Sequence, residues 1–322
     1  MRSFSISADD ASQRLDKFTE KVTVSLPRSL LYKYLRTKRI KLNGKKAEIS
    51  TRLCEGDVVE MYIPEEFFDP ESVPEAERLS RIKDGLSIVY EDGNVILTDK
   101  PAGVSCHPDE KQKTDTQIDR VKAYLYKNGS YDPEKAASFS PALCNRIDRN
   151  TSGIVICAKN AEALREMNEL IRRRRVQKMY FALAKGKFDR ASGVLKNYLI
   201  KDSAENRVAV YDSPRKGALT AVTEYRVVSY DGKTDRTELD ILLHTGRTHQ
   251  IRAQLAHIGH PLVGDGKYAE NREDRKRGFA HQVLRAKAVA FAIPESEKAD
   301  FPLLCYLDGM RFECKEEKED NK

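Results

Sequence analysis

Nine residues, NRIDRNTSG from Asn145 to Gly153, combine side chains that can form an ionic site with those of a tight turn. They place one carboxylate, Asp148, between two arginines, and the apolar run IVICA follows directly. The run predicts a buried strand, and a carboxylate just before such a strand needs a partner to stay charged. Asp148 is therefore a candidate catalytic carboxylate. The structural alternative is a turn aspartate that accepts hydrogen bonds from the amides of Asn150 and Thr151.

A second stretch, residues 243–265, predicts a helix with a guanidinium beside its apolar stripe. Ile251, Leu255 and Ile258 recur at helical spacing, and Arg252 lies one position from that stripe. A guanidinium that emerges next to buried surface is a suitable partner for a buried carboxylate. Arg252 is therefore a candidate partner for such a group.

The same stretch holds four histidines, but their pattern does not predict a metal site. They are spaced irregularly, and no carboxylate or thiolate is arranged to complete a ligand set. We expect these residues to be structural or to face RNA: His244, His249, His257 and His260.

A third stretch, residues 177–186, alternates as a strand does, so that Tyr180 can point into a cleft. A strand tyrosine is usually core packing. Tyr180 alone therefore predicts no function.

The net charge of +7 is concentrated in clusters. Nine basic residues and no acidic one lie from Lys21 to Ala47, and further clusters lie at residues 171–178 and 271–278. A solvated helix face explains one such cluster more easily than three. Three clusters indicate a polyphosphate partner, because each neutralised phosphate releases bound counterions.

Length and composition predict a soluble protein with one large domain and one small one. The 322 residues exceed the ~100–200 of an ordinary domain. No apolar stretch approaches the ~20 residues of a membrane span, and the N-terminus lacks an apolar signal core. The six cysteines are scattered without a Cys-x-x-Cys pair. We expect a cytoplasmic monomer that makes no contact with membranes.

The chain divides into four segments by composition. We expect a small αβ unit over residues 1–63, a catalytic unit over 81–314, and a charged, frayed tail over 315–322. Residues 64–80 contain three prolines and a run of acidic residues, which is typical of a linker.

The larger unit alternates strand patterns with few helices. Helices are predicted at about residues 115–126, 161–174 and 248–258. Strands joined mostly through hairpins predict an α+β fold with a large mixed, mostly antiparallel sheet.

The first unit resembles the small RNA-binding domain named after ribosomal protein S-four. The matching segments are Arg-Leu-Asp-Lys-Phe at 14–18, a basic helix within 26–40, Lys-Leu-Asn-Gly-Lys at 41–45 and Gly-Asp-Val-Val at 56–59. A further helix is expected over 10–24. The resemblance implies that RNA is bound by the basic residues Arg28, Lys33, Arg36, Lys38 and Arg39.

Taken together, the three chemistry-bearing stretches resemble the ordered motifs of pseudouridine synthases that act on ribosomal and transfer RNA. These motifs are Arg-hydrophobe-Asp with Thr-Ser-Gly, then Lys-x-Tyr, then Thr-Gly-Arg-Thr-His-Gln-Ile-Arg ahead of Gly-His-Pro-Leu-x-Gly-Asp. Lys100-Pro101-Ala102-Gly103 with His107-Pro108 also resembles the family. The match spans roughly residues 86–293.

The resemblance implies an isomerisation: uracil is detached from ribose at N1, rotated and reattached through carbon five. Asp148 is implied as the essential carboxylate, acting on the sugar, on the base or in glycal formation. Arg252 is implied as its ion-pair partner, and Tyr180 as the residue that stacks on uracil and assists proton movement. Arg146 is implied to fill the space left by the flipped nucleotide. The resemblance implies neither a cofactor nor a metal.

Further RNA contacts are expected from Asn145, Arg247 and His249. The family usually has histidine where this chain has Asn145, and Ile147 replaces a leucine. Isoleucine keeps the volume, whereas asparagine keeps hydrogen bonding and loses the ring. By family analogy, the N-terminal domain favours large-subunit ribosomal RNA over transfer RNA as the substrate.

Three other classes of protein share some of these features. A non-catalytic RNA-binding or ribosome-assembly protein would share the basic clusters, but it does not need Asp148, Tyr180 and Arg252 together. A glycosidase or nucleosidase needs a second catalytic carboxylate ~5–10 Å from the first, and no second motif carries one. A metal-dependent nuclease needs a cluster of acidic ligands, which the sequence lacks.

Overall fold

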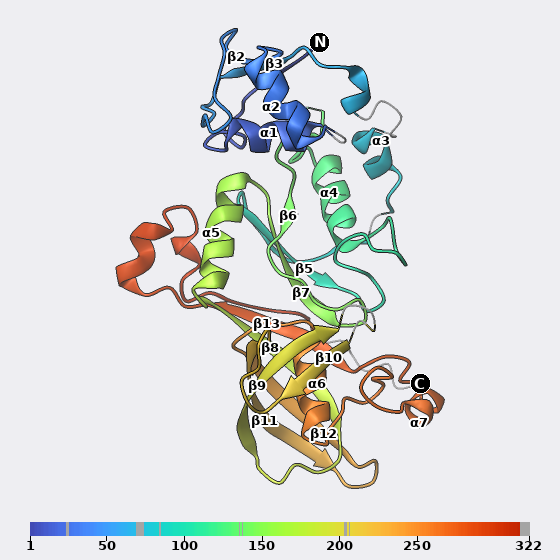
Figure 1. Cartoon of the computed structure of the whole chain (residues 1–322). Coiled ribbons are helices and arrows are strands. Elements are labelled where there is room, and N and C mark those ends of the chain that lie inside the picture. Colours follow the sequence, from blue (N-terminus) through green and yellow to red (C-terminus); the bar gives the residue numbers. More distant parts are fainter. Residues whose placement is uncertain are drawn as a thin grey trace.

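Two sheets organise the chain, which is described by a computed structural model (Figure 1). The described residues are 1–23, 26–68, 74–83, 85–134, 136, 138–202, 205 and 207–315. A three-stranded sheet belongs to the N-terminal unit, and an eleven-stranded sheet belongs to the larger unit. The predicted α+β class with a large, mostly antiparallel sheet is confirmed. Of the predicted tail, only Lys315 lies within the described residues.

The N-terminal unit packs two helices against the small sheet, whose strand order is β1-β3-β2. Phe18, Leu31 and Met61 lie in its core. The first helix begins later than residue 10, because residues 10–14 form turns in which Ser12 has a positive φ. The elements are β1 (Arg2–Ser5), α1 (Leu15–Val22), α2 (Arg28–Arg36), β2 (Ile40–Leu42) and β3 (Val58–Met61).

The described parts of the expected linker pack on the units at either side of it. Phe68, which follows the 3-10 helix η1 (Glu65–Phe67), is buried in the N-terminal core. Leu79, in helix α3 (Glu75–Ser80), packs in the core of the larger unit. The two units also touch directly, because the Ala161 amide donates to the Asp9 carboxylate at 2.9 Å.

The large sheet has the order β10-β9-β11-β12-β8-β13-β7-β5-β4, with β14 beside β13 and β6 beside β7. Its strand pairs are antiparallel except β13 with β7. The strands are β4 (Ser87–Glu91), β5 (Val95–Lys100), β6 (Ala142–Leu143), β7 (Ser152–Ala158), β8 (Val176–Lys185), β9 (Ser192–Asp202), β10 (Arg207–Tyr211), β11 (Leu219–Asp231), β12 (Arg236–Leu243), β13 (Leu284–Phe291) and β14 (Arg311–Glu313).

Helices cover this sheet at several places (Figure 1). No helix among the described residues is both long enough and apolar enough to cross a membrane. The three predicted helices are present, each slightly shorter than predicted. The structure also contains a short helix, α7, and two 3-10 helices that were not predicted. These elements are α4 (Gln117–Lys127), α5 (Ala161–Arg172), α6 (Gln250–His257), α7 (Arg272–Lys276), η2 (Glu295–Asp300) and η3 (Cys305–Leu307).

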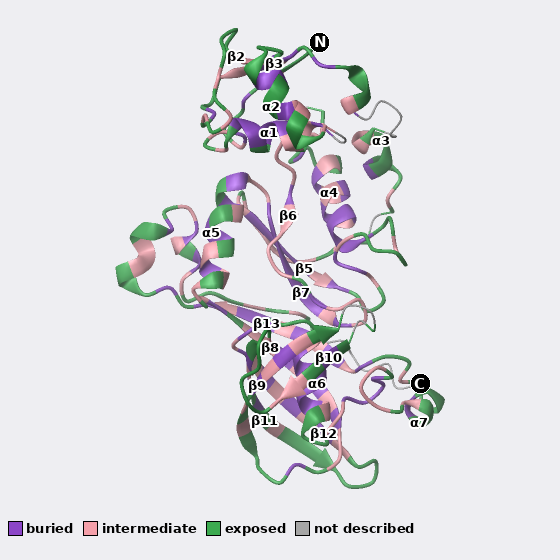
Figure 2. Cartoon of the chain, in the orientation of Figure 1, coloured by how far each residue is buried: buried purple, intermediate pink, exposed green. Residues whose placement is uncertain are grey.

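Strand β7 is buried on both faces, which explains its unbroken apolar sequence. Ile154 and Ile156 point into the core that includes α5, whereas Cys157 points into the core that includes α4. Figure 2 shows the corresponding buried band through β5 and β7. The loop before β7 is therefore attached to one of the most firmly packed strands of the molecule.

Gly153 allows β7 and β13 to come together. The two strands pair in parallel only at Ser152 with Arg285 and Gly153 with Ala286. Gly153 has a φ of +114°, and a Cβ there would lie 2.2 Å from the Ala286 carbonyl oxygen. Only glycine fits such a backbone approach. The glycine of the Thr-Ser-Gly motif thus joins the two halves of the sheet.

The substitution Gly153→Ala should destabilise the protein by at least ~3 kcal/mol, since it adds an overpacking cost to a left-handed backbone cost. Gly129→Ala is the matched control, because Gly129 also has a positive φ but nothing lies within 4 Å of its Cβ position. Urea unfolding followed by circular dichroism measures both. Equal losses in the two variants would show that the close approach to Ala286 is unimportant.

Candidate active site

Asp148 lies in the loop between β6 and β7, and its side chain is 28 % exposed. The turn is closed by the backbone, because the Thr151 amide donates to the Asp148 carbonyl oxygen at 3.0 Å. The carboxylate faces away from the turn amides and toward Arg252. The turn-aspartate alternative therefore does not describe this side chain. The carboxylate is available for another role.

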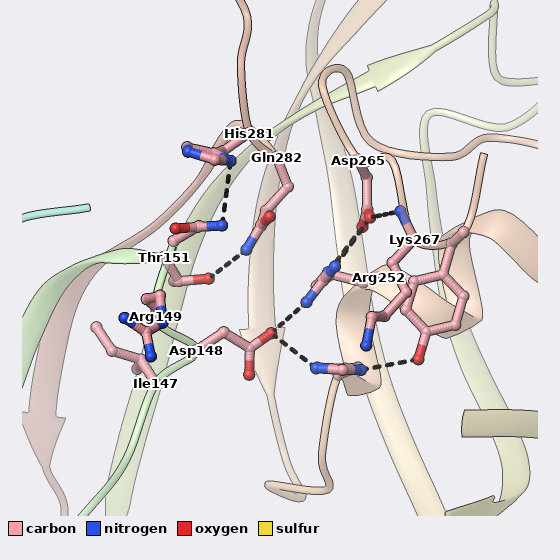
Figure 3. A network of polar contacts seen from close by, with 12 residues as sticks. Ile147, Asp148, Arg149, Thr151, Arg252, Asp265, Lys267, His281 and Gln282 are labelled. Carbon is pink, nitrogen blue, oxygen red and sulfur yellow. Dashed lines mark hydrogen bonds and ion pairs between the residues drawn. The ribbon is translucent and has the colours of Figure 1, made fainter. Parts of the chain in front are cut away.

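Arg252 bridges two carboxylates (Figure 3). Its Nη1 donates to Asp148 Oδ2 at 2.8 Å. Its Nε and Nη2 donate to Asp265 Oδ2 and Oδ1 at 2.7 and 2.9 Å, in the bidentate geometry that favours a guanidinium. Burial opposes the charge of Arg252, but Asp265 and then Asp148 raise its pKa, so it stays protonated. The predicted pairing of Arg252 with Asp148 is present in the structure.

Asp265 is the carboxylate that sequence reasoning missed. Its side chain is only 1 % exposed, and burial alone would raise its pKa, but Arg252 lowers it overall. The Lys267 amide donates a further hydrogen bond at 3.0 Å. The Gly-Asp end of the Gly-His-Pro-Leu-x-Gly-Asp motif was the available signal.

The two arginines beside Asp148 in the sequence do not pair with it. Arg149 binds Asp109, and its carbonyl oxygen accepts from Lys100. Arg146 is exposed and makes no hydrogen bond or ion pair with any described residue. Asp148 thus takes its partner from a residue 104 positions later in the chain.

Helix α6 carries Arg252 and is held in place by buried polar side chains. Gln254 accepts from Thr223 Oγ1 at 2.7 Å and donates to Asn197 Oδ1 at 2.7 Å. Gln250 donates to Thr223 Oγ1 at 2.9 Å and accepts from Thr245 Oγ1 at 2.8 Å. Buried polar groups cost free energy unless they are paired. The network therefore fixes the helix against β9 and β11 in one position.

Lys100 holds the loop of Asp148 from the other side. Its fully buried ammonium group donates to the carbonyl oxygens of Pro101, Val104 and Arg149 at 2.7–2.9 Å. Burial lowers the pKa of Lys100 to about 8. Through the bond to the Arg149 carbonyl oxygen, Lys100 joins the Lys-Pro-Ala-Gly segment to the residue that follows Asp148. This segment, which resembled the family in sequence, therefore has a structural role.

Tyr180 and Lys178 lie on one face of β8 and line the same cavity as Asp148. Burial, and then the charge of Asp148, raise the pKa of Tyr180, so its hydroxyl stays protonated. A Cβ at Gly246 would lie 3.4 Å from Lys178 Nζ. Burial lowers the pKa of Lys178, and no described residue forms a hydrogen bond or ion pair with its ammonium group.

The cavity has a volume of about 1280 Å³ and is strongly cationic. It brings together Asp148, Tyr180 and Arg252, as predicted, with Arg146, Asn145, Arg247 and His249 around them. The cations that line it include Lys111, Arg172, Arg174, Lys178, Lys201 and Lys267. Part of the basic cluster at residues 171–178 therefore faces the cavity.

Three of the expected RNA-binding residues already have partners within the protein. Asn145 accepts from the Ile156 amide at 2.7 Å and donates to the Ile154 carbonyl oxygen at 3.4 Å. Its side-chain amide therefore pairs with the backbone of β7. Arg247 donates to the Thr220 carbonyl oxygen, and His249 contacts Tyr268. RNA contacts by these residues stay predictions.

The basic residues of the N-terminal unit form an exposed surface at α2 and the turn after it. Arg28 pairs with Glu20 at 2.8 Å, and Arg39 lies over the Tyr34 ring. Lys33, Arg36 and Lys38 are exposed and have no partner among the described residues. Three cations of this surface are therefore free to meet an anionic ligand.

The histidines do not assemble into a metal site. Among the described residues, no group of three or more His, Cys, Asp or Glu side chains is arranged to hold a metal ion. His244 pairs with Glu224, His257 pairs with Asp212, and His260 stacks on Phe188.

Residues 94–257 match the family model of RNA pseudouridylate synthase. The chain is 35 % identical over 320 residues to an uncharacterized RNA pseudouridine synthase of Mycoplasma genitalium, which covers 97 % of this chain and 95 % of the relative. It is 30 % identical over 299 residues to ribosomal large subunit pseudouridine synthase C of Vibrio vulnificus, with 91 % of this chain and 89 % of the relative covered.

The fold also matches a solved structure, that of human RNA pseudouridylate synthase domain containing 4. The TM-score is 0.54 at 21 % identity, and the match covers 76 % of this chain and 91 % of the other. The likeness in structure concerns the fold, and the sequence matches show the family. This chain belongs to the RNA pseudouridine synthase family.

Proposed function

We propose that the chain converts uridines of large-subunit ribosomal RNA to pseudouridine in the cavity around Asp148. The observation that carries this proposal is the arrangement of Asp148. One carboxylate oxygen is bound by a buried arginine, while Oδ1 has no hydrogen-bond partner among the described residues. A charged, oriented and partly exposed oxygen at the edge of a cavity can act on a substrate placed there.

The proposed reaction is balanced within the nucleotide. The bond between N1 and the ribose breaks, a bond between carbon five and the ribose forms, and a proton leaves carbon five while one is gained at N1. Asp148 acts on the sugar or the base, and Arg252 keeps it charged. Tyr180 supplies a ring that can stack on uracil and a hydroxyl that stays protonated.

A stacked base cannot reach a recessed carboxylate, so the target nucleotide has to leave the RNA stack. Arg146 is exposed beside Asp148 and is free of protein partners in the described chain. We assign it to the space that the flipped nucleotide vacates. Lys178 and the other cations of the cavity supply charge for the phosphates on either side.

We further propose that residues 1–63 form an RNA-binding domain of the S-four type, that the catalytic domain spans 81–314, and that the protein acts in the cytoplasm. Two helices on a three-stranded sheet, with the exposed cations Lys33, Arg36 and Lys38, support the RNA-binding role. The relative named ribosomal large subunit pseudouridine synthase C covers 91 % of this chain, which supports ribosomal RNA as the substrate. Transfer RNA is the competing substrate.

Asp148→Asn tests the proposed carboxylate. It removes the charge but keeps the shape, so pseudouridine formation should fall by at least ~10²-fold, with RNA affinity and folding nearly unchanged. Asp212→Asn is the control, because Asp212 is an exposed carboxylate outside the cavity. Purified protein is incubated with unmodified ribosomal RNA, and pseudouridine is measured by mass spectrometry. More than about a tenth of wild-type turnover, once deamidation is excluded, would sink the assignment.

Arg252→Met should lower both stability and activity. It leaves Asp265 buried without its partner, which costs on the order of 3–5 kcal/mol unless the carboxyl is protonated. Adding Asp265→Leu should restore part of the stability, because no buried charge is then left unpaired, but activity should stay low. Urea midpoints and initial rates separate the two effects. An unchanged midpoint in Arg252→Met would contradict the structural role of the pair.

Replacing Lys33, Arg36 and Lys38 together by alanine should weaken RNA binding and reduce its salt dependence. Removing one cation that binds a phosphate flattens the slope of log affinity against log salt by ~0.7–0.9. The matched control replaces Arg190, Lys196 and Lys233, which are exposed and lie outside the cavity. Binding is measured across a salt series. Equal slopes for the two triple variants would show that the N-terminal cations do not contact RNA.

A further inference from the structure

His249 lies between the proposed catalytic carboxylate and a tyrosine. Its Nε2 is 3.8 Å from Asp148 Oδ2, and its Nδ1 is 2.9 Å from the Tyr268 hydroxyl. Only 9 % of its side chain is exposed. Dashed lines in Figure 3 trace this chain of contacts from Asp148 through an imidazole to a phenol. The histidine therefore belongs to the polar surroundings of Asp148.

The backbone at His249 adopts an uncommon conformation. His249 precedes the first residue of α6 and has a left-handed φ of 50°. This conformation is uncommon for a residue with a side chain, and such residues gather at functional sites. It is also the N-cap position, yet the side chain makes no capping hydrogen bond. The ring is turned toward Asp148 and Tyr268 instead.

The hydrogen bonds around Tyr268 favour one position for the proton of the His249 ring. The Val208 amide donates to the Tyr268 hydroxyl oxygen at 3.0 Å, and an amide can only donate. Val208 lies in β10, at the edge of the sheet. The hydroxyl proton is then free to point at His249 Nδ1, which accepts it in the Nε2–H tautomer. In that tautomer the single N–H proton of the neutral ring is on Nε2, on the side of Asp148.

The surrounding charges are compatible with a neutral ring. Burial is the largest influence and lowers the pKa of His249; Asp148 raises it, Arg252 and Lys267 lower it, and Asp265 raises it least, so that the net shift is downward. Burial also raises the pKa of Tyr268, which keeps its phenol protonated. A further cation, Arg207, lies over the Tyr268 ring.

We infer that His249 is a positioning residue for Asp148: as the Nε2–H tautomer set by Tyr268, it holds Oδ2 so that Oδ1 faces the uridine. The inference rests on the proposed function, and it gives His249 a role other than the predicted RNA contact. The distance of 3.8 Å exceeds that of a hydrogen bond. Contacts of this kind tighten when substrate binds.

Four single substitutions separate this role from RNA binding. His249→Phe keeps a ring but removes the donor, and it should lower kcat by roughly 10- to 100-fold, the effect of misplacing a catalytic group by about 1 Å. His249→Gln keeps a donor near the Nε2 position and should recover part of that loss. Tyr268→Phe removes the group that sets the tautomer. His257→Phe, on the same helix but outside the cavity, is the control.

Release of tritium from carbon five of labelled ribosomal RNA gives kcat and KM for each variant. The expected pattern is a fall in kcat for His249→Phe and Tyr268→Phe, with KM and RNA affinity within about threefold of wild type. Combining these two substitutions should cost less than the product of the single effects, because they act through one contact. A rise in KM with unchanged kcat would overturn the inference and assign His249 to RNA binding.

Imidazole nitrogen shifts, measured by NMR on the wild-type protein, provide a test that does not depend on how a variant folds. At pH 7 we expect a bare Nδ1 and a protonated Nε2 at His249. A proton on Nδ1 would overturn the inference. Wild-type protein without pseudouridine activity would instead refute the proposed function. The two failures are therefore distinguishable.

Discussion

The ionic bridge from Asp265 through Arg252 to Asp148 is the interaction on which the site depends. Asp265 is almost fully buried and binds the guanidinium with both oxygens, whereas Asp148 is partly exposed and is bound through one oxygen. The inner carboxylate offsets the cost of burying Arg252. The outer carboxylate can then be oriented without being enclosed. One guanidinium therefore both pairs with the buried Asp265 and orients the partly exposed Asp148.

This bridge imposes demands on the rest of the fold. Asp148 has to stay in the loop before β7, a strand that is packed on both faces and joined to β13 through Gly153. Arg252 has to stay on α6, which Gln250 and Gln254 bind to the strands beneath it. The two halves of the large sheet thus supply opposite sides of one ion pair. Distortion at their junction would separate the pair.

Sequence motifs predicted much of the site, and their limits have a physical cause. Asp148, Tyr180 and Arg252 were identified because each lies in a local pattern, and the structure places all three around one cavity. Asp265 was missed as a partner, and His249 was predicted only as an RNA contact, because pairing depends on how α6 and the loop after it meet. The helix predicted over residues 248–258, in contrast, depends on a local apolar pattern and forms as α6.

The proposed function requires that this chain forms pseudouridine in ribosomal RNA through Asp148. The most direct measurement maps pseudouridines in the RNA of cells that lack the gene and carry either the wild-type protein or Asp148→Asn at equal levels. We predict that specific pseudouridines of the large-subunit RNA are lost with the gene, return with the wild type and stay absent with the variant. An unchanged pseudouridine map after loss of the gene, or restoration by the variant, would contradict the account.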